Sequence, residues 1–137
     1  MNKFTFTDLE LLETIQKEYA DDYLKSMNDA KLGLKNTRFY IPIDCKKIAQ
    51  KMKVEEDIIF NRLYFHLNKK YSYKDEIDKN KIVYFFTFNE LKDAKRCINY
   101  GYLCSVLADL KDNRKQEYIT RAIAIVSILI SIIALFH

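Results

Sequence analysis

The sequence predicts a mainly helical fold with a small β-hairpin, followed by a long helix and a C-terminal transmembrane helix. Glycine occurs twice and proline once among 137 residues, whereas turn-rich β-sandwiches need more of both. Apolar residues make up 49% of the chain, which supplies a packed core for one domain of ordinary size. The segment from Ala122 to Phe136 carries no charge. These observations predict a folded domain over residues 1–88, a connecting helix over 89–118 and a membrane segment over 119–137.

The first helix is expected to begin after Thr7. Thr7 and Glu10 match a capping box, in which each side chain binds the backbone N–H of the other residue, and Phe6 can pack on Leu11. Apolar side chains then recur at helical spacing for about five turns, up to Gly33. The predicted inner side of this helix comprises Leu9, Leu12, Ile15, Tyr19, Tyr23 and Met27.

Two shorter helices follow a predicted strand at residues 38–41. Pro42 stops this strand because proline has no N–H to donate to a neighbouring strand. Asp44 is a good N-cap for a helix over residues 45–52. The next helix, over residues 58–69, has apolar residues at helical spacing along one side. This inner row comprises Ile59, Leu63 and Leu67.

A β-hairpin is expected next, with arms at residues 71–73 and 82–88 and a charged turn at 75–80. The resulting order over residues 7–88 is helix, strand, helix, turn, helix and hairpin. This order resembles a winged helix-turn-helix domain, and its most telling stretch is CKKIAQKMKVEEDIIFNRLYFHL. Within that stretch, IAQKMKV would supply the second helix and the turn, and residues 58–69 the recognition helix. The resemblance implies a winged-helix fold with DNA binding as its default use.

The recognition helix of that family lies in the major groove of DNA, so the resemblance implies a ligand-binding outer face on this helix. Here Glu55, Glu56 and Asp57 crowd the start of the helix, where carboxylates would repel phosphates. Outward-facing Ile58 and Phe65 would instead favour a protein partner. We therefore expect a protein partner and do not favour nucleic acid. The expected partner-binding or DNA-binding face comprises Ile58, Asn61, Arg62, Phe65 and Lys69.

A long connecting helix is predicted after the hairpin. Thr87 and Glu90 match a second capping box, and Gly101 marks either a kink or a close contact. Cys97 and Cys104 would lie on one side of this helix. No helix-breaking residue stands between Gly101 and the C-terminus, so the helix is expected to run continuously into the apolar segment. Its predicted apolar side comprises Leu91, Ala94, Ile98, Leu103, Val106 and Leu110.

The apolar terminal segment predicts a membrane helix. As a helix, residues 122–136 measure about 22 Å, against about 30 Å for the hydrocarbon core of a bilayer. Arg121 can extend its charged end toward the bilayer surface, which lengthens the usable stretch back to Tyr118. A buried core helix and a helix lying in the membrane interface are the alternatives. The expected anchor residues are Tyr118, Arg121, Ala122, Ile125, Ile128, Leu129, Ile132, Ile133 and Phe136.

The charges flanking this segment predict its orientation. Lys111, Arg114, Lys115 and Arg121 precede it, and only His137 follows it. Because Lys and Arg residues favour the cytoplasmic side, the folded domain is expected in the cytoplasm. The chain would then be a single-pass, tail-anchored protein of the inner, or cytoplasmic, membrane.

Small residues form one stripe along the predicted membrane helix. Ala124, Ser127, Ser131 and Ala134 are spaced by three, four and three residues. In lipid, small side chains let two helices approach closely, and serines can bond across the contact. The stripe therefore predicts a helix–helix interface and a homo-oligomer.

Catalytic and cofactor motifs are not found in the sequence. It contains no Gly-rich phosphate loop, no G-x-S-x-G and no H-E-x-x-H, and its only histidines are His66 and His137. The three cysteines form no C-x-x-C motif. We expect neither an enzyme nor a cofactor-binding or metal-binding protein. Three hypotheses follow: a membrane-anchored interaction protein whose anchors associate, a membrane-tethered DNA-binding regulator, and a soluble oligomer that buries its terminal helix between subunits.

Overall fold

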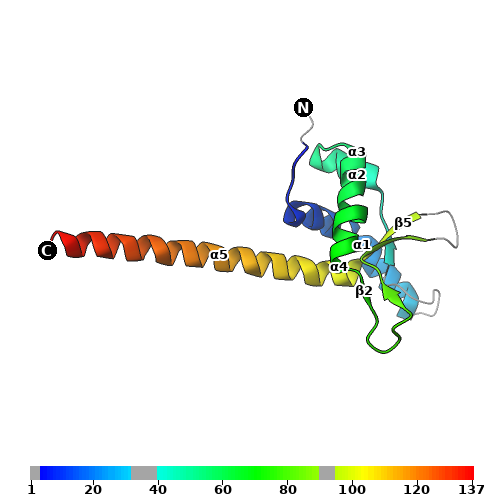
Figure 1. Ribbon diagram of the computed structural model, residues 1–137. Coiled ribbons are helices and arrows are strands. Elements are labelled where there is room, and N and C mark those ends of the chain that lie inside the picture. The colour runs from blue at the N-terminus through cyan, green and yellow to red at the C-terminus, as the bar shows by residue number, and fades with distance from the viewer. Residues whose placement is uncertain (1–3, 32–39, 90–94) are drawn as a thin grey trace.

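The computed structural model describes residues 4–31, 40–89 and 95–137. The chain is mostly helical, with a small antiparallel sheet and one long apolar helix at the C-terminus (Figure 1), as the sequence predicts. The start of that helix packs with the other elements around one core, and its remaining length extends far from the domain.

Helix α1 spans Asp8–Lys31 and begins with the predicted capping box. The Thr7 N–H donates to Glu10 Oε2 at 2.9 Å, and the Glu10 N–H donates to Thr7 Oγ1 at 3.1 Å. Leu11, Leu12 and Ile15 are fully buried. The expected end of the helix at Gly33 lies outside the described residues.

Strand β1 spans Tyr40–Pro42, and helix α2 spans Cys45–Met52. Asp44 caps α2 as predicted, because its carboxylate accepts from the backbone N–H groups of Lys46 and Lys47. The Asp44 N–H donates to the Tyr19 hydroxyl at 2.8 Å, which ties the start of α2 to α1. Arg38, where the strand was expected to begin, lies outside the described residues.

The predicted third helix is a rod made of three segments. Helix α3 spans Glu56–Asn61, the π-helix η1 spans Arg62–Leu67 and helix α4 spans Asn68–Tyr71. The predicted inner row is confirmed, since Ile59, Leu63 and Leu67 have no exposed surface.

The predicted hairpin forms, but it is shorter than expected. Strand β2 (Tyr73–Lys74) pairs with β3 (Ile82–Val83) in an antiparallel arrangement. After Val83 the chain leaves this hairpin, and the Tyr40 hydroxyl holds Tyr84 by donating to its carbonyl and accepting from its N–H.

A second hairpin replaces the predicted start of the connecting helix. Strand β4 spans Phe86–Asn89 and strand β5 spans Lys95–Asn99. They form a three-stranded antiparallel sheet in the order β1-β5-β4. The capping box at Thr87 is therefore wrong, because Thr87 lies in β4 opposite Cys97. Cys97 and Cys104 lie in a strand and a helix, and do not share one helix side.

Helix α5 spans Tyr100–Leu135 without a break. Asn99, the last residue of β5, caps it by accepting from the Tyr102 N–H at 3.2 Å. The helix packs against α1 near its start, where the Tyr100 hydroxyl donates to the Gln16 carbonyl at 2.6 Å. Gly101 lies in the first turn, and a side chain there would meet nothing within 4 Å. Gly101 therefore marks neither a close contact nor a kink.

Candidate membrane segment and partner-binding face

The two ends of α5 have opposite environments. Near its start, Tyr100, Leu103, Val106 and Leu107 are buried in the core. From Lys111 onward every residue is exposed, and the helix extends away from the domain (Figure 1). The helix is long and apolar enough to cross a membrane, and none of its apolar stretch is buried within the chain. A core helix of the same chain would instead be covered.

The predicted anchor residues are presented on all sides of this exposed helix. Residues 118–135 measure about 27 Å, close to the thickness of a hydrocarbon core. Large apolar side chains around the helix are exposed, and Ile125, Ile128 and Leu129 are each more than half exposed. At the domain-side end, the Arg114 guanidinium lies 5.9 Å from the ring centre of Tyr118. This end combines cations and an aromatic ring, which is typical of a membrane interface.

The stripe of small residues lies on the exposed helix. The Ser127 hydroxyl donates to the Ile123 carbonyl, and the Ser131 hydroxyl donates to the Ser127 carbonyl, both at 2.9 Å. Both hydroxyl protons are therefore used within the helix, and the oxygens keep only accepting capacity. Small volume, more than hydrogen bonding, is what this stripe offers a neighbouring helix.

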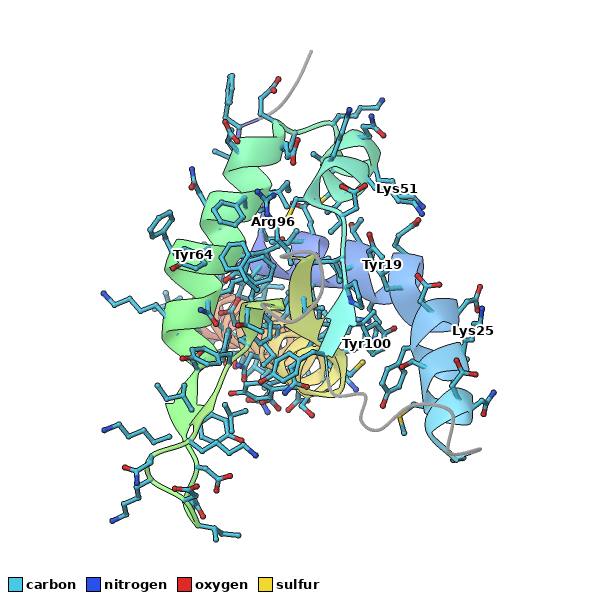
Figure 2. The ribbon with its side chains drawn as sticks, turned by 90° about the vertical axis from the view of Figure 1, so that its right-hand side faces the viewer. Tyr19, Lys25, Lys51, Tyr64, Arg96 and Tyr100 are labelled. Carbon is cyan, nitrogen blue, oxygen red and sulfur yellow. The ribbon has the colours of Figure 1, made fainter. Side chains whose placement is uncertain are left out.

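The rod of α3, η1 and α4 exposes aromatic side chains. We call Phe60, Tyr64, Phe65 and Phe88 the aromatic face. Tyr64 contacts Phe65, Phe60 and Phe88, with ring centres 4.9, 5.5 and 5.8 Å apart. Tyr64 is 38% exposed and Phe65 is 64% exposed. Figure 2 shows Tyr64 pointing away from the domain.

The expected partner-binding residues are only partly brought together. Asn61, Phe65 and Lys69 are exposed on the rod. Ile58, in contrast, is half-buried and packs on the core, so its expected outward position is wrong. Arg62 is half-buried, and its Nε donates to Asp8 Oδ1 at 2.7 Å.

Three of the four members of the aromatic face, Phe60, Tyr64 and Phe88, were missed from the sequence. Tyr64 lies in η1, and Phe60 and Tyr64 directly follow the buried Ile59 and Leu63, so helical spacing places them at the edge of the inner row and not on the outer face. Phe88 was assigned to the first hairpin, whereas it belongs to β4 and lies beside the rod. π-Helical turns occur frequently at functional sites, which adds to the interest of this face.

Arg96 of β5 borders the aromatic face. Its guanidinium carbon lies 4.3 Å from the ring centre of Phe60, and its Nη1 lies 3.6 Å from Glu56 Oε1. Burial raises the pKa of the neighbouring Cys45 thiol, and contact with Arg96 opposes that rise. Cys45 is therefore a buried, uncharged thiol beside the aromatic face.

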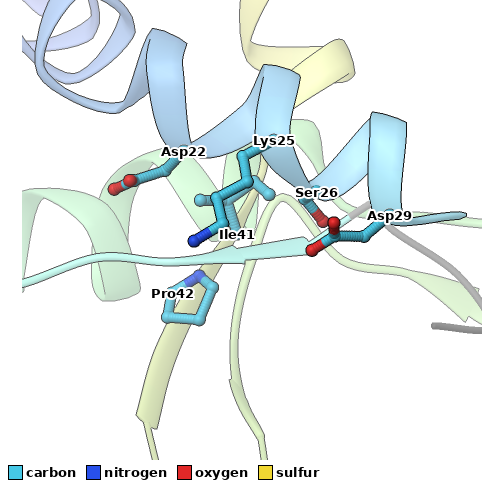
Figure 3. A pocket seen from close by; sticks show the side chains of 6 residues that line it. All are labelled: Asp22, Lys25, Ser26, Asp29, Ile41 and Pro42. Carbon is cyan, nitrogen blue, oxygen red and sulfur yellow. The ribbon is translucent and has the colours of Figure 1, made fainter. Parts of the chain in front are cut away.

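A separate pocket lies between the end of α1 and β1 (Figure 3). It has a volume of 260 Å³ and is lined by Asp22, Lys25, Ser26, Asp29, Ile41 and Pro42. Its polar groups come from successive turns of α1, where Asp22 and Lys25 are exposed and Ser26 and Asp29 are half-buried, as on an ordinary hydrated helix surface. Among the described residues, no three His, Cys, Asp or Glu side chains are placed to hold a metal ion.

Comparisons of the chain with protein-family models, with curated proteins and with solved structures found no match. The functional argument therefore depends on the molecule's own geometry.

Proposed function

We propose that this chain is a non-enzymatic, membrane-anchored interaction protein. The observation that carries the proposal is the uncovered apolar half of α5, where Ile, Leu and Val side chains are exposed on every side. Keeping such a surface in water costs about 25 cal/mol for each Å² of apolar area. A lipid environment removes this cost, so we infer that this half of α5 spans a membrane.

The proposed orientation places the folded domain in the cytoplasm. Lys111, Arg114, Lys115 and Arg121 lie on the domain side of the apolar segment. Lys111 also contacts Glu13 of α1 at 3.0 Å, so one of these cations is held against the domain. The excess of Lys and Arg on this side supports a cytoplasmic domain.

We further propose that the anchors associate and that the rod binds a protein. Ala124, Ser127, Ser131 and Ala134 offer the anchor side on which two helix backbones can approach. The aromatic face offers a large, rigid, half-exposed surface of the kind enriched at protein interfaces.

The winged-helix resemblance is also a proposal, and it leads to a DNA-binding alternative. The order α1, β1, α2, α3 and the pairing of β1 with β5 support the fold, with hairpin β4–β5 in the position of the wing. Glu56 and Asp57 in the first turn of α3 oppose DNA binding. We expect residues 1–117 to bind duplex DNA weakly and without sequence preference. Tight, site-specific binding that weakens steeply with salt would favour the alternative.

Membrane fractionation of the full chain tests the main proposal. We expect the chain to sediment with membranes and to resist both high salt and alkaline carbonate, while detergent releases it. Release by carbonate would contradict a spanning helix. A chain that stays in the supernatant without detergent would indicate the soluble oligomer instead.

A further inference from the structure

The aromatic face carries opposite charges at its two ends. Glu56 and Asp57 lie in the first turn of α3, and Lys69 and Lys70 lie in the last turn of the rod. The aromatic rings of Tyr64 and Phe65 lie between these ends. Asp57 and Lys69 are exposed, and neither forms an ion pair with another described residue. A surface with this arrangement is complementary to a copy of itself that runs in the opposite direction.

We propose that a second copy of this chain occupies the aromatic face, with the two rods antiparallel. Asp57 of each copy would then lie opposite Lys69 of the other, and Asn61 opposite Phe65. Tyr64 and Phe65 would pack at the centre, where contact with the other copy removes their exposed ring surface from water. Such a contact is isologous, since both copies use the same residues.

The membrane geometry supports this arrangement. The rod runs crosswise to α5 in Figure 1, and Figure 2 looks along α5 with Tyr64 pointing sideways. Two copies in one membrane with the same orientation are related by a two-fold axis along the membrane normal, hence roughly along α5. Such an axis reverses the direction of any helix that lies parallel to the membrane. It therefore produces the antiparallel rods that the charges favour.

This inference rests on the proposed function, because the shared membrane fixes the direction of the axis. It is separate from association of the anchors, which uses residues of α5. The domain contact uses the rod and β4, so each contact can be removed without changing the other.

Cysteine crosslinking of the full chain in membranes tests the direction of the rods. Copies with Asp57→Cys and copies with Lys69→Cys, carrying different tags, are expected to crosslink with each other. Copies that all carry Asp57→Cys should not crosslink, because antiparallel rods hold the two positions about 18 Å apart along the axis. The unsubstituted chain gives the background from Cys45, Cys97 and Cys104.

Charge reversal tests whether Asp57 of one copy attracts Lys69 of the other. Asp57→Lys or Lys69→Glu alone replaces two attractions by two repulsions, so we expect about a tenfold weaker dimer in detergent solution. The double variant carries both reversals and should return to within about twofold of the original. Phe65→Ser should also weaken the dimer, whereas Ile77→Ser should not, although Ile77 at the tip of the first hairpin is 98% exposed.

The outcomes separate this inference from the proposed function. Carbonate release of the chain contradicts the membrane anchor, whatever the crosslinks show. A carbonate-resistant chain that crosslinks through Asp57→Cys pairs, or fails to be restored by the double reversal, overturns the antiparallel dimer alone. A carbonate-resistant chain with no crosslink and no effect of Phe65→Ser also overturns it.

Discussion

The domain and the far half of α5 use the same apolar residues in opposite ways. Leu63 has no exposed surface, whereas Leu129 is 53% exposed. In the domain, apolar side chains alternate with polar ones, and the alternation directs one side of each element to the core. In α5 beyond Arg121 there is no charged side to direct outward. Apolar content alone therefore does not locate a core; the arrangement of polar residues around each helix decides it.

Removing residues 119–137 is the strongest test of whether the domain folds independently of the exposed half of α5. We expect the remaining chain to be folded and soluble, because the core residues of the domain all precede Lys111. The measurement is fractionation together with cooperative thermal unfolding. A truncated chain that aggregates or unfolds would mean that the exposed half of α5 is part of the domain's core.

Matched leucine substitutions in the two regions should differ by several kcal/mol. Leu63→Ala creates a cavity in a fully buried site, so we expect a loss of about 2–5 kcal/mol in the free energy of unfolding. Leu129→Ala should leave the domain's unfolding free energy unchanged, because Leu129 contacts no part of the core. Denaturant titration of both variants in mild detergent measures the difference. Equal losses would contradict two separate environments.

Within the apolar half of α5, the stripe of small residues should behave differently from the other sides of the helix. Ser127→Ile with Ser131→Ile fills the side on which two helices can approach, so we expect several-fold less crosslinking between anchors in membranes. Ile128→Leu with Ile132→Leu preserves volume and lies away from the stripe, so crosslinking should not change. Equal crosslinking of both pairs would mean that the stripe has no role in association.

Acid should affect the domain through Glu18. Hydrogen bonds from Lys47 and Lys51 lower the pKa of Glu18 below its ordinary value of 4.5. The carboxylate therefore stabilises the folded domain above that value, and the contribution is lost as pH falls through the lowered pKa. We expect Glu18→Gln to be slightly less stable than the original chain at pH 7 and equally stable in strong acid. A difference that persists in acid would assign the effect to packing.

Local signals in the sequence predicted much of this fold. Thr7 and Asp44 cap helices where expected, because a cap depends only on residues within one turn. The inner row of the rod follows from helical spacing. The continuity of α5 follows from the lack of a breaking residue after Gly101.

The second hairpin could not be predicted in this way. Thr87 begins a good capping pattern, and the apolar residues that follow it have helical spacing. Strand formation there depends on pairing of β5 with β1, in which Ile98 lies opposite Ile41, far away in the sequence. This long-range pairing outweighs the local helical preference. The same error hid Phe88, and Phe60 and Tyr64 lie at the edge of the inner row, so three of the four residues of the aromatic face were missed.

The passage from β5 into α5 at Asn99 and Tyr100 has no loop. The central strand of the sheet is thus joined directly to α5, and the number of residues in α5 fixes the rotation of the domain about the helix axis relative to the apolar end of the helix. One residue inserted between the domain and the anchor would turn the domain by about 100° and lift it by about 1.5 Å. Four residues would leave the domain about 40° from its original orientation and lift it by about 6 Å. The length of α5 therefore also determines the direction in which the domain faces, relative to the apolar end of the helix.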